Sequence, residues 1–74
     1  MRLFNVTTKS GLTLLVETAL MVEAPPHMRW YAYLGEIDIG APSVSAVDEQ
    51  TAIRDLIDAY TEENIEKIEM RVKK

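Results

Sequence analysis

The first part of the chain alternates apolar and polar residues with the period of a β-strand. Residues 2–8 (RLFNVTT) are rich in β-branched and aromatic types, and they run into Gly11, which can take the positive φ of a tight hairpin. From there to Val22, apolar side chains recur on one face, with Thr18 as the exception. The pattern predicts two strands, over residues 2–8 and 12–22, joined by a hairpin turn.

A third strand is expected after a break at Pro25 and Pro26, since proline nitrogens cannot donate to a β-ladder. Residues 29–39 (RWYAYLGEIDI) again carry the aromatic and aliphatic types that favour strands, and Gly40 ends the run. Residues 43–47 (SVSAV) are expected to lead, in an extended conformation, into the next element.

The period of the apolar positions then changes to that of a helix. One stripe at three-and-four spacing is formed by Ala52, Ile53, Leu56, Ile57 and Tyr60. This spacing predicts a helix over residues 48–60. Asp48 or Ser45 can cap its first turn, and Asp48 and Glu49 suit the positive end of the helix dipole.

The tail alternates once more, which predicts a final strand over residues 65–73. Ile68, Met70 and Val72 share one face, and charged residues occupy the other. The expected order is β-β-β-α-β, an α+β fold in which an antiparallel four-stranded sheet carries one helix on one face. We expect one domain over residues 1–74. Because the first strand has few charged residues to guard its open edge, the sheet is also compatible with a homodimer.

The amino-acid composition bears on the compartment in which the protein is expected to reside. The chain has no cysteine, so it carries neither a disulfide nor a thiolate metal site, as is usual in the cytoplasm. The apolar stretch of residues 12–22 could instead be read as a signal peptide or membrane segment. It is too short to cross roughly 30 Å of hydrocarbon, and Glu17 interrupts it, so we expect a cytoplasmic protein that does not enter a membrane.

The acidic residues are concentrated in one segment. The net charge is only −4, from twelve acids and eight bases. Residues 36–66, however, hold nine acids against Arg54 alone, a local charge of −8. On the predicted helix, the apolar stripe leaves these carboxylates only the solvent side.

Two interpretations of this acidic face remain open. Its charges can simply keep a solvated helix soluble, since such fields are screened within about 8 Å at physiological salt. Alternatively, the face can attract a basic partner and speed its association. Direct binding of nucleic acid is not expected, because the basic residues needed for phosphate contacts are confined to the short tail.

Residues capable of catalysis are sparse. His27 is the only histidine, and Gly11, Gly35 and Gly40 are isolated rather than arranged in a phosphate-binding loop. The two carboxylates of Glu36 and Asp38 would share a strand face, but a pair without further oxygen ligands makes a poor calcium site. The sequence therefore predicts a protein without catalytic activity, bound metal or cofactor.

The aromatic segment at residues 29–33 also permits two interpretations. Trp30 and Ala32 share one strand face, and Tyr31 and Tyr33 share the other. The aromatic rings can serve sheet packing through cross-strand pairs. If the helix covers the face of Trp30, the tyrosines lie on the open face, where they can contact a partner.

Residues 30–60 resemble the core of HicB-type antitoxin domains, which combine an aromatic strand, a Glu-hydrophobic-x-x-Gly turn and a helix that opens with an acid pair and alanine. The matching positions are Tyr31, Ala32, Glu36, Ile37, Gly40, Asp48, Glu49 and Ala52. The resemblance implies an antitoxin or related interaction module with a small basic toxin as its partner.

In size, charge and lack of cysteine, the chain is also similar to the small acidic inhibitors with which bacteriophages take over their hosts. That resemblance implies a DNA-mimic-like protein that presents carboxylates to the basic, nucleic-acid-binding site of a host protein, and we adopt it as the leading hypothesis. The predicted partner-binding residues are Glu36, Asp38, Asp48, Glu49, Asp55, Asp58, Glu62, Glu63, Tyr31 and Tyr33.

Overall fold

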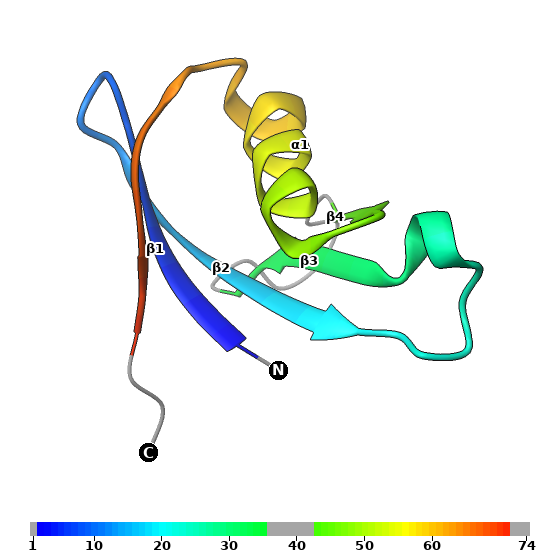
Figure 1. Cartoon of the computed structure of the whole chain (residues 1–74). Helices are drawn as coiled ribbons and strands as arrows, with labels where there is room; N and C mark the ends of the chain where they lie inside the picture. Colours follow the sequence, from blue (N-terminus) through cyan, green and yellow to red (C-terminus); the bar gives the residue numbers. More distant parts are fainter. Residues whose placement is uncertain (1, 36–42, 72–74) are drawn as a thin grey trace.

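One antiparallel sheet carries a single helix on one face (Figure 1), in a computed structural model that describes residues 2–35 and 43–71. The sheet order is β4-β3-β2-β1-β5. The elements are β1 (Arg2–Thr8), β2 (Thr13–Leu20), a short 3-10 helix η1 (Pro26–Met28), β3 (Trp30–Leu34), β4 (Ser43–Ala46), α1 (Glu49–Thr61) and β5 (Ile65–Met70). The expected α+β class is confirmed, but the sheet has five strands rather than four.

The predicted hairpin joins β1 and β2. Gly11 has a φ of +95°, and its N–H donates to the Thr8 carbonyl over 3.0 Å. A residue with a Cβ rarely adopts this backbone conformation, so the turn uses the glycine's freedom. β2 ends at Leu20, two residues earlier than predicted.

The position of β1 differs from the expectation that it is an open edge. β5 returns antiparallel to it on the side away from β2, with Val6 opposite Ile68 and Asn5 opposite Glu69. The first strand therefore needs no charged side chains to prevent pairing with another chain, because both of its edges are already paired. Among the described residues, the sheet edges are β4 and β5.

The strand that the sequence prediction missed is β4. It pairs with β3 so that Ala46 lies opposite Trp30 and Val44 opposite Ala32. Ser43 and Ser45 are exposed, whereas Ala46 is buried. Such alternation is typical of a strand with one buried face, but over four residues it is too brief to stand out from an extended loop. The preceding strand, β3, covers only part of the predicted 29–39, and residues 36–42 lie outside the described residues.

The core lies between α1 and the sheet. The helix packs mainly against β3 and β4 (Figure 1). Four residues of the predicted stripe have no exposed surface: Ala52, Ile53, Leu56 and Ile57. The inclusion of Tyr60 was wrong, since it is 43% exposed in the last turn. On the sheet side, Val6, Val16 and Ala32 are likewise fully buried. The helix and the sheet therefore pack together through a single thin apolar layer.

The predicted alternation of the final strand is confirmed for its described residues. Ile68 and Met70 face the helix side, because they lie opposite the buried Val6 and Phe4. Ile68 is half-buried, but Met70 is 57% exposed at the edge of the sheet. In the part of the chain that the structure describes, no helix is both long and apolar enough to cross a bilayer.

Candidate functional site

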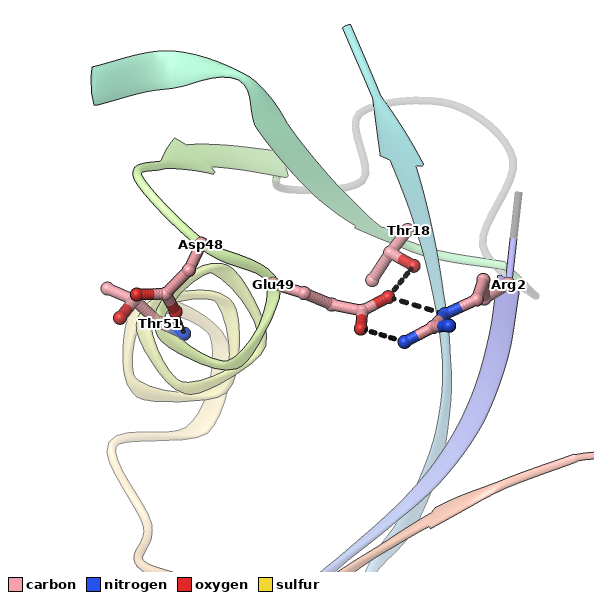
Figure 2. Close-up of polar contacts among 5 residues, drawn as sticks. All are labelled: Arg2, Thr18, Asp48, Glu49 and Thr51. Carbon is pink, nitrogen blue, oxygen red and sulfur yellow. Dashed lines mark hydrogen bonds and ion pairs between the residues drawn. The ribbon is translucent and has the colours of Figure 1, made fainter. Parts of the chain in front are cut away.

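The acidic segment begins at the N-terminus of α1, where Asp48 caps the helix. Its side chain accepts a 2.8 Å hydrogen bond from the backbone N–H of Thr51 (Figure 2). This hydrogen bond lowers the pKa of the Asp48 carboxyl, because it stabilises the charged form. The side chain remains exposed, so Asp48 combines a capping role with a solvent-facing charge.

The next carboxylate, Glu49, points inward instead of towards solvent. Figure 2 shows it reaching from the first turn of α1 to the strands beneath, and only 8% of the residue is exposed. It accepts hydrogen bonds from the Thr18 hydroxyl at 2.8 Å and from Arg2 Nε at 3.0 Å. A second Arg2 nitrogen, Nη2, bonds the other carboxylate oxygen and completes a two-point ion pair.

These contacts give Glu49 a structural role. The Arg2 guanidinium, itself half exposed, has its pKa raised by the hydrogen bond and charge of Glu49. A buried carboxylate is costly unless it is paired and hydrogen-bonded, and here both conditions are met. With its oxygens occupied by β1 and β2, Glu49 is not free to bind a partner. We therefore leave it out of the proposed surface.

The exposed carboxylates gather at the other end of the helix. Asp55 and Asp58 are exposed on α1, and they line a shallow groove together with Glu63. The groove has a volume of about 280 Å³ and lies between α1 and the start of β5; its remaining lining residues are Arg54, Asn64 and Ile65. Three carboxylates against one guanidinium leave this acidic groove with negative charge, in a recess large enough for a long basic side chain.

Glu63 is oriented by the hairpin between β1 and β2. Its carboxylate accepts a hydrogen bond from the Ser10 hydroxyl, which in turn lies 3.0 Å from the Thr8 hydroxyl. Hydrogen bonding from Ser10, and then from Thr8, lowers the pKa of Glu63. The hydrogen bond from Ser10 thus orients this carboxylate on the wall of the groove.

Glu62 adjoins the groove in an unusual backbone conformation. It ends α1 with a φ of 59° and a ψ of 25°, the left-handed region that glycine prefers, and its N–H donates to the Asp58 carbonyl at 3.1 Å. Its side chain is exposed, and it is the chain neighbour of the groove residue Glu63. Asp48 is ten residues before Asp58 along the helix, a separation of about 15 Å, and does not belong to this group.

The tyrosines lie on the opposite face of the sheet. The helix covers Ala32, so Tyr31 and Tyr33 point away from it, and their ring centroids are 5.5 Å apart. The Tyr33 hydroxyl donates a 2.9 Å hydrogen bond to Glu17. Partial burial, and then this hydrogen bond, raise the pKa of Tyr33. The structure therefore does not bring the tyrosines together with the acidic groove, and one partner surface cannot include both.

Two predicted residues, Glu36 and Asp38, lie outside the described residues. Sequence reasoning missed three groove residues, Arg54, Asn64 and Ile65, because the groove forms only where the helix and β5 meet. It also missed the Arg2–Glu49 pair. Thr18, the one polar residue in the apolar face of its strand, was the available signal, since a buried hydroxyl needs a hydrogen-bond partner.

Within residues 2–35 and 43–71, no three potential ligands among His, Asp and Glu are grouped as a metal site requires. His27 is exposed on η1, a region distant in sequence from the acidic groove. The groove itself places the carboxylates of Asp55, Asp58 and Glu63 beside the guanidinium of Arg54.

Comparisons with protein-family models, with curated protein sequences and with solved structures found no match to this chain. The resemblances to HicB-type antitoxins and to phage inhibitors therefore stay predictions, and any functional proposal rests on the geometry of the acidic groove.

Proposed function

We propose that this chain is a small non-enzymatic protein that binds a basic protein through the acidic groove and the adjoining Glu62, and so occupies the nucleic-acid-binding site of its partner. The observation that supports the proposal is the convergence of Asp55, Asp58 and Glu63 on one recess. In this respect the chain would act as the small acidic phage inhibitors do, with a host protein as its target.

The position of these carboxylates favours binding over a purely solvating role. Asp55 and Asp58 flank the buried Leu56 and Ile57 on the exposed side of α1, where packing does not require charge. Like charges at this spacing destabilise a helix slightly, and negative charge in its last turn opposes the dipole. A basic partner would relieve both costs, since it would neutralise the charges at the C-terminal end.

The groove also has the shape that a basic side chain needs. Arginine and lysine bury an aliphatic stem while their charged end stays with polar groups. Ile65 offers an apolar contact for the stem, and the carboxylates on either side can accept hydrogen bonds from the charged end. Proteins that bind nucleic acid carry such side chains on their contact surface, so a carboxylate-lined recess can compete with phosphates for them.

Affinity capture from a host lysate at low and high salt tests this proposal. The wild-type chain should retain a basic protein at low salt and release it at high salt, because the contact is between exposed charges. Asp55→Asn/Asp58→Asn should weaken the binding about three- to thirtyfold, from about 0.3 to 1 kcal/mol for each exposed charge.

The matched control is Glu23→Gln/Glu66→Gln, which removes the same charge from two exposed positions outside the groove. This control should bind as the wild type does. Retention that is unaffected by both salt and the Asp55/Asp58 substitutions would overturn the proposal and make the open-face tyrosines the next surface to test.

The antitoxin alternative predicts the same kind of surface with a different partner. Tyr31 and Ala32 lie in β3, and Asp48, Glu49 and Ala52 lie at the start of α1, but β4 separates the two elements, where the resemblance implies only a connection. A HicB-like antitoxin would have a small basic toxin encoded in the neighbouring gene. Inspection of that gene distinguishes the two hypotheses without any binding assay.

A further inference from the structure

Within residues 2–35 and 43–71, no strand pairs with the outer edge of β5. The N–H of Arg71 donates to the Leu3 carbonyl at 2.8 Å, and Glu69 and Lys67 lie opposite Asn5 and Thr7. In an antiparallel ladder, alternate residues direct their backbone groups to the same side. The groups of residues 67, 69 and 71 therefore meet β1, whereas those of Ile68 and Met70 point away from the sheet. Figure 1 shows β5 as the outermost strand on its side.

The side chains of this edge carry opposite charges in a self-complementary order. Lys67 and Glu69 share the face away from the helix, with Nζ and Oε1 3.6 Å apart, and both are more than half exposed. Ile68 and the exposed Met70 lie on the helix side. Charged residues usually protect an edge strand from pairing with other strands. Here their order disfavours registers that oppose like charges and allows those that place a basic residue opposite Glu69.

We propose that β5 pairs antiparallel with β5 of a second copy of this chain, in a register centred on Ile68. The two five-stranded sheets would then become continuous, with both helices on the same face. The outward backbone groups of Ile68 would bond the partner's Ile68, and the two isoleucine side chains would extend the apolar layer across the junction.

Charge and strand length together favour this register. A register centred on Met70 would place Glu69 opposite the partner's Arg71, but Met70 is the last residue of β5, so little of the two strands would overlap. Centring the pair on Lys67 would place it opposite the partner's Lys67, and centring it on Glu69 would oppose two glutamates. With Ile68 at the centre, Lys67 lies opposite the partner's Glu69 at both symmetric positions. Residues at these positions do not share backbone hydrogen bonds, so their Cα atoms would be only about 4.5 Å apart and their side chains close.

The contact is expected to be weak and to depend on concentration. A bulge in the pairing at Thr7 and Thr8 ends the regular ladder of β5 at Lys67, so few residues can take part. The other edge, β4, is a four-residue strand without this charge pattern. The dimer test changes Lys67, Ile68 and Glu69, none of which lines the acidic groove, so its outcome is independent of the function proposed above.

Variants in which one charge is reversed test the register. Sedimentation velocity at several concentrations measures the dissociation constant of the dimer for each variant. The wild-type chain should dimerise reversibly. Lys67→Glu and Glu69→Lys should each raise the dissociation constant roughly tenfold or more, since two opposite-charge pairs become like-charge pairs. An equimolar mixture of these two variants should form a heterodimer, because both acidic side chains of the first variant would then lie opposite lysines of the second. Wild-type chains that stay monomeric throughout, or variants that dimerise equally well alone, would overturn the proposal.

A cross-link gives a second readout that does not depend on the stability of the charge variants. Ile68→Cys would introduce a single thiol at the two-fold axis, where the facing Cα atoms are expected about 5.5 Å apart, a distance that a disulfide spans. It should form a covalent dimer on mild oxidation, much faster than Ala59→Cys on the exposed side of α1. Equal cross-linking of the two variants would contradict a junction at Ile68.

Discussion

The hydroxyl of Thr18 donates a 2.8 Å hydrogen bond to the carboxylate of Glu49, although the two residues are 31 positions apart in the chain. Thr18 is fully buried in β2, and Glu49 lies in the first turn of α1. Together with Arg2 on β1, this contact holds the start of the helix over the middle of the sheet (Figure 2). A threonine in an apolar strand face and a glutamate in an acidic segment are thus parts of one structural contact.

Thr18→Val should therefore destabilise the fold by about 1 to 2 kcal/mol. Valine has nearly the same shape, but it leaves the buried Glu49 oxygen with one hydrogen bond fewer. Urea unfolding followed by circular dichroism measures the change. Thr13→Val, at an exposed position on the same strand, is the matched control and should change the stability far less. Equal effects at the two positions would mean that the Thr18 hydroxyl contributes nothing specific.

Glu49→Gln should be costlier than Asp55→Asn, although both substitutions remove one carboxylate from the same helix. Glutamine can still accept from Thr18, but it cannot form the two-point ion pair with Arg2. We expect a loss of about 1 to 3 kcal/mol at residue 49 and a change within about 0.5 kcal/mol at residue 55, which is exposed. Comparison of the two unfolding midpoints tests whether Glu49 is structural.

Acid should weaken the fold partly through Asp48. Its pKa is lower in the folded chain than in the unfolded one, because the Thr51 N–H stabilises the carboxylate. The contribution is therefore present above the unfolded pKa and is lost as the pH falls through the folded value, below about pH 4.

Asp48→Asn isolates this effect, because asparagine also caps helices but does not titrate. The variant should match the wild type near neutral pH and lose less stability between about pH 4 and pH 2. Unfolding curves at a series of pH values provide the measurement. An equal loss of stability in the two proteins as the pH falls would show that the Asp48 cap does not contribute to acid sensitivity.

Replacement of Glu62 by glycine should stabilise the protein by about 0.5 to 1 kcal/mol. Glu62 holds a left-handed backbone conformation that strains residues with a Cβ but not glycine. Glu62→Ala is the control, because it removes the same charge and keeps the strain. A gain for alanine as large as that for glycine would attribute the effect to the lost charge rather than to the backbone.

Much of the fold could be predicted because the apolar periodicity is strong in the first hairpin, the helix and the final strand. The location of β5 beside β1 could not, since pairing depends on contacts between segments distant in sequence. β4 escaped prediction because two of its four residues are serines that face solvent. Local pattern thus identified the longer elements but not the topology.

The acidic residues chosen from the sequence occupy different surroundings in the structure. Sequence position alone could not separate Glu49 from Asp48, because one turns inward to Arg2 and the other outward as a cap. Asp55 and Asp58 could be placed on the exposed helix side from the stripe of buried residues. Their convergence with Glu63 required the three-dimensional meeting of α1 and β5.

The most direct test of the proposed function is displacement of nucleic acid from the captured partner. Fluorescence anisotropy would follow a labelled duplex DNA or RNA bound to that protein while the wild-type chain is added. We predict that the nucleic acid is released as this chain binds, that Asp55→Asn/Asp58→Asn requires about three- to thirtyfold more protein for the same release, and that Glu23→Gln/Glu66→Gln behaves as the wild type. A partner that holds the nucleic acid and this chain at the same time would contradict the account.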